Sequence, residues 1–367
     1  MRALMRTHAA LLCVGVLTFI LMGAGQSLYG PALPVYARAY DIGLGTAGLL
    51  VSAHWIGCAF GVGAMFVWGR FVTPRVVVVL MALGAALLAT GAGWSVALLG
   101  GLVFGAGYGA ATVVFNPRML RAFGPRGPAM VSLLNATFGI GAIGAPLVFV
   151  ALGNDPVLAF AVCAALAAAL ALAAGAAGGA EAVSASQGAT AFKPHWPMLG
   201  FALIAIGIEA SVIGLGPAAL IKAGESETHA AQWLSAFFLA FLAARVSLSF
   251  VAHVLPSFTL FTLAMAGASL SCLGAAALAA GPCFVALGFF AGMFFPTGYV
   301  TASHKMGDHP WVAPAIISAG LAGGIALPLL VAPFLVALGA HGFFWLGSAV
   351  TAALTLLALA NLPAMNR

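Results

Sequence analysis

Charged side chains are so sparse along this sequence that they leave apolar runs long enough to cross a lipid bilayer. Only 5% of the 367 residues are charged and 63% are hydrophobic, whereas soluble domains carry about 25% charged residues. A membrane helix needs about 20 mostly apolar residues. The composition therefore excludes a soluble globular enzyme and predicts an all-α membrane protein.

The gaps between charged residues predict twelve transmembrane helices. Single spans are expected at 7–37, 42–69, 127–154, 156–180 and 195–221, two each at 76–117 and 309–366, and three at 228–304. The expected breaks within the longer runs are Gly91–Trp94, Val254–Pro256, Gly281–Pro282 and Gly339–His341. The first run is too long for a signal peptide and continues into polar residues, so we expect it to be retained.

The distribution of cations predicts the orientation in the membrane. With twelve spans both termini share one side, and ten cations fall there: Arg2, Arg6, Arg70, Arg75, Arg118, Arg121, Arg126, Lys193, Lys305 and Arg367. The opposite side carries two, Arg38 and Lys222. Because short cytoplasmic loops are enriched in Lys and Arg, both termini are expected in the cytoplasm, with the chain in the inner (plasma) membrane. This topology explains the net charge of +6 without a nucleic-acid partner.

An internal repeat divides the sequence near its midpoint. Gly139–Pro146 matches 321–328 at an offset of 182, Gly105 and Gly109 match Gly288 and Gly292 at 183, and 30–32 matches 216–218 at 186. The polar, small-residue stretch between the copies is expected to be a linker. The sequence thus predicts an N-terminal six-helix bundle (1–177), a cytoplasmic linker (178–196) and a pseudo-symmetric C-terminal six-helix bundle (197–367).

Four motifs carry a resemblance to a known family. They are Asn116-Pro117 with the basic loop after it, Asn135 followed by the glycine-rich Gly139–Pro146, Gly207-Ile-Glu209, and Phe294-Phe-Pro296. In these the chain resembles the major facilitator superfamily, and more narrowly its branch of fucose-permease-like sugar–proton symporters. The resemblance implies a monomeric secondary active transporter without a cofactor. Its two halves would alternate access to a small polar solute, sugar-like or another metabolite, and coupling to protons would drive it.

The sequence departs from that branch at two acidic positions. Ser27 and Thr112 stand where the fucose permease carries acids, so that route of proton coupling is absent. The loop of 68–75 retains Arg70 and Arg75 of the superfamily signature but has lost its acid.

Two charged residues within predicted spans are the first candidates for the solute or coupling site. Glu209 is the one acid deep inside a predicted span, where an ionised carboxylate is costly. We expect it to accept a proton or to pair across a gate; the alternative is a structural interhelical hydrogen bond. Arg245 is expected to bind an anionic group or to pair with Glu209, or else to extend toward the cytoplasmic surface.

Polar residues inside the predicted spans complete the candidate site. Gln26 and Tyr29 suit a hydroxylated or zwitterionic solute, and His54 is a residue that can titrate near neutral pH. Asn116 and Asn135 are further candidates, and interhelical hydrogen bonding is the alternative for them. At the cytoplasmic ends a set of arginines is expected to fix topology or form gating pairs: Arg70, Arg75, Arg118 and Arg121.

Other classes of function remain to be separated from proton-coupled uptake. An exporter of metabolites or drugs, working as a proton antiporter, would use the same fold. A non-transporting receptor or a membrane enzyme is the remote alternative. The sequence lacks the clustered polar catalytic residues that a membrane enzyme usually shows at the membrane interface. The five cysteines have no metal-ligand spacing, and no phosphate-binding glycine-rich loop supports ATP-driven transport. The expected partners are therefore the solute, protons and the bilayer.

Overall fold

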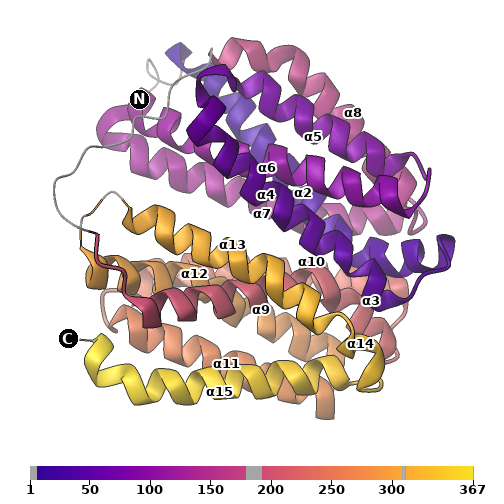
Figure 1. Cartoon of the computed structure of the whole chain (residues 1–367), viewed down its shortest axis with the longest axis vertical. Helices are drawn as coiled ribbons and strands as arrows, with labels where there is room; N and C mark the ends of the chain where they lie inside the picture. The colour runs from indigo at the N-terminus through magenta and orange to yellow at the C-terminus, as the bar shows by residue number, and fades with distance from the viewer. Residues whose placement is uncertain (1–5, 179–191, 308, 310, 367) are drawn as a thin grey trace. The chain divides into compact units, whose positions relative to one another are not determined.

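The computed structural model describes residues 6–178, 192–307, 309 and 311–366, and within them every regular element is a helix (Figure 1). The chain separates into two compact units. Unit 1 comprises Met1–Ile42 and Leu50–Ser184, and unit 2 comprises Gly43–Leu49 and Ala185–Arg367.

The longer helices of unit 1 follow one another along the chain with short connections. They are α2 (Ala9–Ala39), α4 (Leu49–Trp68), α5 (Pro74–Ala89), α6 (Trp94–Phe123), α7 (Gly127–Ala151) and α8 (Pro156–Ala174). Three 3-10 turns end or join them: η1 (Gly69–Phe71), η2 (Gly124–Arg126) and η3 (Gly175–Ala177). Such turns are a common way to finish an α-helix.

Unit 2 repeats this plan. Its longer helices are α9 (Trp196–Lys222), α10 (Glu227–Val251), α11 (Ser257–Ala277), α12 (Ala280–Met306), α13 (Val312–Val331) and α15 (Gly342–Met365). Two four-residue helices, α3 (Leu44–Ala47) and α14 (Phe334–Ala337), pack against each other in the same unit. Of the predicted linker, residues 179–191 lie outside the described residues, and α9 begins at Trp196.

Side-chain caps and prolines set several helix starts. The Thr73 hydroxyl accepts a hydrogen bond from the Val76 N–H (3.2 Å) ahead of α5, and Asp155 accepts one from the Val157 N–H (2.8 Å) ahead of α8. A proline follows each cap directly, where its fixed φ suits the first helical turn. Ser226 caps α10 in the same way, through the His229 N–H.

Three of the four expected breaks are confirmed. One helix ends shortly before each of Gly91–Trp94, Val254–Pro256 and Gly339–His341, and the next begins at its last residue or directly after it. The fourth was placed slightly too late, because α12 begins at Ala280 and includes Pro282 in its first turn. A proline is tolerated there since its missing N–H would have had no intrahelical partner.

Helix length and hydropathy are those of a multi-pass membrane protein. Ten segments of the described chain are long and apolar enough to cross a bilayer. One of them, Trp94–Ala151, is 58 residues long and contains both α6 and α7. Helix α5 is apolar but only 16 residues long. Large apolar side chains also face outward, such as Leu172 (82% exposed) and Leu278 (87%), as expected of a surface that lipid covers.

The two units share their internal packing. In unit 1, α2 packs on α7, and α5 packs between α6 and α8; in unit 2, α9 packs on α13, and α11 packs between α12 and α15. Glycines make the helix crossings close. A Cβ on Gly105 would overlap the carbonyl oxygen of His54, and a Cβ on Gly288 would overlap that of Phe237.

A second set of crossings obeys the same correspondence. Gly141 faces the carbonyl oxygen of Ile20 where α7 meets α2, and Gly323 faces that of Leu203 where α13 meets α9. In both sets the matched residues are 182 or 183 positions apart. The repeat in the sequence is therefore also a repeat of contacts, made by small residues that let two helix backbones approach.

Candidate functional site

A cluster of polar and aromatic side chains lies where α2, α4 and α6 meet inside unit 1. The Tyr29 hydroxyl lies 3.2 Å from Nδ1 of His54, in a hydrogen bond whose direction depends on the histidine tautomer. The Tyr108 hydroxyl donates to Oε1 of Gln26 at 2.9 Å. Gln26, Tyr29 and His54 are all buried, at 7%, 1% and 1% exposure. Polar groups at this depth require partners or a ligand.

The close crossing of α4 and α6 brings the two hydrogen-bonded pairs together. Because Gly105 has no side chain, the backbone of α6 lies against the carbonyl of His54. The Tyr108 ring, one turn further along α6, therefore meets the imidazole edge-on with 5.0 Å between ring centroids. Trp55 also meets Tyr108 edge-on, with 6.3 Å between the ring centroids.

Two polar atoms of this cluster make no hydrogen bond to the described residues. Nε2 of His54 is buried without a partner. The only hydrogen bond found there for the Gln26 amide is the one its oxygen accepts from Tyr108. An unpaired buried polar group costs about 1–3 kcal/mol. The cluster therefore offers an imidazole nitrogen and an amide nitrogen that a polar ligand can satisfy.

Unit 2 carries the charged counterpart of this cluster. Glu209 lies on α9, and the positive charge of Arg245, on α10, acts on its carboxyl group. Oε2 of Glu209 is shielded from solvent and accepts no hydrogen bond from the described residues. The Arg245 guanidinium stacks on the Phe241 ring one turn earlier in α10, 4.4 Å from its centroid. The two charged residues predicted from the sequence thus lie within electrostatic range of each other.

Gln26 and Glu209 each lie on the first long helix of their unit, α2 and α9. They are 183 residues apart, whereas the Gly-Pro-Ala motifs further along the same two helices, 30–32 and 216–218, are 186 apart. At the offset of 183 that relates Gly105 to Gly288, Arg245 corresponds to Val62, which is uncharged. In its first long helix one unit carries a buried amide, and the other carries a carboxyl group with a nearby guanidinium.

Asn116 and Asn135 pair with each other. Nδ2 of Asn135 lies 3.4 Å from Oδ1 of Asn116 and donates to the Val131 carbonyl at 2.8 Å. The pair joins α6 to α7, and Asn135 is exposed. This is the interhelical hydrogen bond that the sequence left as the alternative to solute binding.

The four arginines assigned to gating or topology lie at helix ends. Arg75 donates to the Leu172 carbonyl near the end of α8 (3.3 Å), and Arg118 donates to the Ala177 carbonyl at the end of η3 (3.4 Å). Arg70 stacks on Phe71 at 4.6 Å, and Arg121 is exposed. A cation at a helix C-terminus is stabilised by the helix dipole and by the terminal carbonyls.

Two aromatic residues of these clusters are missing from the candidates predicted from the sequence. Tyr108 supplies the hydroxyl that engages Gln26, 82 positions away in the sequence, and no local pattern reveals such a pair. Phe241 supports Arg245 from four residues away on the same helix. That second contact could have been found, because residues i and i+4 share a helix face.

Comparison with known families decides what kind of protein carries these two clusters. The family model described as the Major Facilitator Superfamily matches residues 15–310. The chain belongs to this superfamily. Its members and the structures similar to this chain are transporters, so the protein is not an enzyme. A sequence search finds no match among curated proteins.

Solved structures of superfamily transporters share the fold over nearly the whole chain. A D-xylose–proton symporter matches with a TM-score of 0.75 at 13% identity, covering 95% of this chain and 96% of its own. The nucleoside transporter NupG matches with a TM-score of 0.77 at 13% identity, and the match covers 98% of this chain and 100% of NupG. FucP in its outward conformation matches with a TM-score of 0.62 at 18% identity, and the match covers 95% of this chain and 97% of FucP. The fucose-permease-like branch is therefore one of several similar groups.

Proposed function

We propose that the protein is a secondary active transporter that moves a small polar solute across the inner membrane, coupled to protons, by alternating access of its two halves. The observation that carries the proposal is that two of the buried polar atoms left without a hydrogen bond by the described residues belong to these clusters: Nε2 of His54 in unit 1 and Oε2 of Glu209 in unit 2. A membrane interior tolerates such atoms where a solute or a proton occupies them in the working cycle.

The two clusters have different roles in this proposal. Gln26, Tyr29 and His54 bind the solute through neutral hydrogen-bonding groups beside aromatic rings, while Asn116 and Asn135, which hydrogen-bond to each other, join α6 to α7. Glu209 accepts the coupled proton. Arg245 competes for the same carboxyl group, because its positive charge favours the ionised form. Protonation of Glu209 therefore weakens its attraction to Arg245, which gives the proton a means of altering the site.

The architecture proposed with this function is that of twelve spans in two six-helix halves, 1–177 and 197–367, joined by a cytoplasmic linker at 178–196. Both termini lie in the cytoplasm, and Arg70, Arg75, Arg118 and Arg121 hold the cytoplasmic helix ends. The four sequence motifs favour a relationship to the sugar symporters, so a sugar-like solute is the first to test.

The experiment begins by finding a solute. Purified protein is screened for thermal stabilisation against sugars, nucleosides, amino acids and organic anions, and the strongest binder is used in proteoliposomes with an imposed pH gradient. For one proton per solute, each unit of pH difference supports about tenfold accumulation. We expect the parent protein to accumulate the solute on the alkaline side.

Glu209→Gln separates coupling from binding. The variant should lose uphill accumulation while it still exchanges labelled for unlabelled solute across the membrane. Glu225→Gln, in the turn between α9 and α10, is the matched control and should behave like the parent. Uphill accumulation by Glu209→Gln at the parent level would rule out the proton role.

The direction of coupling distinguishes uptake from export. In proteoliposomes of known orientation, a symporter moves solute and protons the same way. An antiporter moves them in opposite directions, and the protein would then be an exporter on the same fold.

A further inference from the structure

The hydrogen bond between Tyr29 and His54 has a direction, and that direction decides what unit 1 can bind. The Tyr29 hydroxyl lies 3.2 Å from Nδ1 of His54, and both side chains are 1% exposed. Neither side chain makes another hydrogen bond with the described residues. If the phenol donates, Nε2 of the imidazole carries an N–H group; if the imidazole donates, Nε2 carries a lone pair.

The chemistry of the two groups favours donation by Tyr29. An imidazole nitrogen is a stronger base than a phenol oxygen, because imidazole takes up a proton near neutral pH and a phenol does not. A bond from the O–H group to nitrogen is therefore the stronger arrangement. It also gives the hydroxyl proton an acceptor, which the opposite arrangement would leave buried without one. With Nδ1 as the acceptor, a neutral His54 carries its proton on Nε2.

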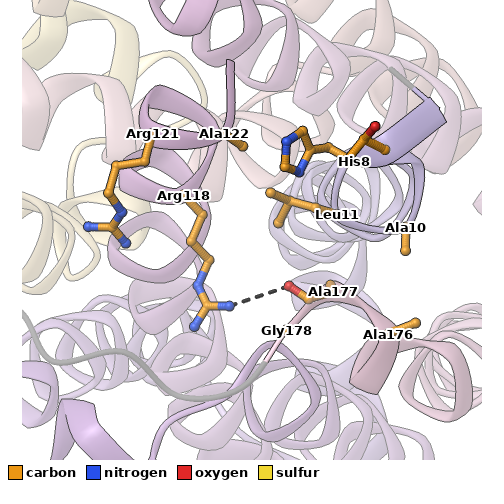
Figure 2. Close-up of a pocket in the computed structure, with 10 residues that line it drawn as sticks. His8, Ala10, Leu11, Arg118, Arg121, Ala122, Ala176, Ala177 and Gly178 are labelled. Atoms are coloured by element: carbon orange, nitrogen blue, oxygen red, sulfur yellow. Dashed lines mark hydrogen bonds between the residues drawn. The ribbon is translucent and has the colours of Figure 1, made fainter. Parts of the chain in front are cut away.

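Formal charges on the neighbouring helices do not change this assignment. The six long helices of unit 1 contain no Asp or Glu, so a protonated His54 would be a buried cation without a carboxylate partner on them. The described arginines of unit 1 lie at or near helix ends, among them Arg118 and Arg121 in the last turns of α6 (Figure 2). Arg118 follows Tyr108 by ten residues, which is about 15 Å along the helix. His54 is therefore neutral.

Two further donors belong to the same cluster. The Gln26 oxygen accepts from the Tyr108 hydroxyl at 2.9 Å, and the Gln26 amide nitrogen makes no hydrogen bond with the described residues. The Trp55 ring meets the imidazole edge-on, with 5.6 Å between the ring centroids. Its indole N–H, which can only donate, makes no hydrogen bond with the described residues either. Three side chains thus offer N–H groups: His54, Gln26 and Trp55.

Unit 2 forms the same helix crossing without such a pair. At the offset of 183 residues that relates the crossings, His54 corresponds to Phe237 and Tyr29 to Val212. At the offset of 186 residues that relates the Gly-Pro-Ala motifs, Tyr29 corresponds to Leu215. These side chains are all apolar. The fold itself therefore does not require the hydrogen bond between Tyr29 and His54.

We propose that Tyr29 fixes the proton of His54 on Nε2, so that unit 1 binds its solute through an oxygen atom that accepts hydrogen bonds. This role depends on the solute site of the proposed function. Three N–H donors suit the oxygen of a carboxylate or an amide, called an acyl oxygen below. The same site lacks the carboxylate that a solute ammonium group would need. Tyr29 is a positioning residue, because it acts on the solute through the imidazole.

NMR of full-length protein in detergent micelles, with isotopically labelled histidine, measures where the proton lies. The nitrogen chemical shift separates a protonated from an unprotonated imidazole nitrogen. His54→Phe identifies the His54 signals among those of the eight histidines. We expect Nε2 to be protonated and Nδ1 to be unprotonated. A proton on Nδ1, or on both nitrogens, would overturn the proposal.

Tyr29→Phe tests whether the hydroxyl sets the tautomer. Without it both tautomers of His54 should be populated, so the two nitrogen signals should move toward each other. Loss of stability alone would not move them. Tyr40→Phe, at the end of α2, is the matched control and should leave both signals in place. Parent-like His54 signals in Tyr29→Phe would show that Tyr29 does not position the proton.

Three probes of equal chain length test the ligand chemistry: propionate, propionamide and propylammonium. The first two present an acyl oxygen, and the third presents an ammonium group. Each is titrated into the millimolar range while the Nε2 signal is followed. We expect a saturable shift with propionate, propionamide or both, and none with propylammonium; the one that binds tells whether a charged or a neutral oxygen is preferred. No shift with either acyl probe, or an equal shift with propylammonium, would overturn the proposal.

Gln26→Glu replaces an amide N–H donor with a carboxylate oxygen and keeps an acceptor for the Tyr108 hydroxyl. Binding of the acyl probe should weaken roughly tenfold or more, and propylammonium should now bind. Gln232→Glu, exposed on α10 of unit 2, makes the same change of charge and should bind as the parent does. Equal affinity of the two variants for the acyl probe would contradict the role of the donors.

These measurements need no transport, so they separate the donor site from the proposed function. If His54 responds as expected but no solute accumulates in proteoliposomes, the proposed transport is wrong and the donor site stands. If solute accumulates but Nδ1 carries the proton, the transport stands and the role of Tyr29 is wrong.

Discussion

Removing the hydroxyl of Tyr29 should destabilise the protein through its effect on His54. The Tyr29→Phe substitution keeps the ring and deletes a group 3.2 Å from Nδ1 of the imidazole. Interhelical hydrogen bonds in membrane proteins are worth about 0.6 kcal/mol on average. However, both residues are 1% exposed, so the substitution leaves a buried imidazole without its one partner among the described residues. That costs about 1–3 kcal/mol, and we expect a loss of about 1–2 kcal/mol.

A double-mutant cycle isolates this interaction. The cycle combines Tyr29→Phe with His54→Phe, which places in unit 1 the residue found at the matching position 237 of unit 2. Stability is followed by unfolding the purified protein in mixed micelles. Once the imidazole is gone, Tyr29→Phe should cost little, so the coupling energy should be about 1 kcal/mol. Tyr40→Phe, for whose hydroxyl no hydrogen bond is found within the described chain, is the control and should be nearly neutral. A coupling energy near zero would refute the reasoning.

Two further predictions concern helix packing. Gly105→Ala and Gly288→Ala should each destabilise the protein by about 1–3 kcal/mol, because the new methyl group meets a backbone carbonyl that cannot rotate away. The control is Gly63→Ala, whose methyl group meets open space and should leave the stability unchanged. Equal melting temperatures for the three variants would contradict the close helix crossings. Lys222→Met removes a side chain whose Nζ donates hydrogen bonds to two carbonyls of α14. The rate of amide hydrogen exchange in α14 should therefore rise by about tenfold, equivalent to about 1.4 kcal/mol of local stability. Unchanged exchange rates would show that packing alone holds this helix.

The helical framework was largely predictable because it rests on local signals. The breaks at Gly91–Trp94 and Val254–Pro256 follow from residues that disfavour helix continuation, and these signals act within a few positions. The repeat was predictable as well, since Gly105 and Gly288 mark the same crossing in both halves. The short helices α3 and α14 were not predicted, because four residues contain too little periodicity to recognise.

The candidate site was predictable residue by residue but not as an arrangement. Glu209, Arg245 and His54 stand out in the sequence because charged or titratable groups within a membrane span are costly. Their partners do not stand out. The bond between Tyr108 and Gln26 joins residues 82 positions apart, and the identity of a distant partner depends on tertiary packing that a single sequence does not encode in any local pattern.

The glycine crossings separate what holds each bundle together from what the bundle is used for. At the junction of α4 and α6, position 54 contributes only main-chain atoms to the contact with Gly105, whereas position 237 meets Gly288 with both its carbonyl oxygen and its phenyl ring. The crossing of α4 and α6 therefore does not depend on the side chain at position 54. One half can carry an imidazole and the other a phenyl ring without any change in architecture, so this fold is free to acquire new chemistry at the points where its backbones touch.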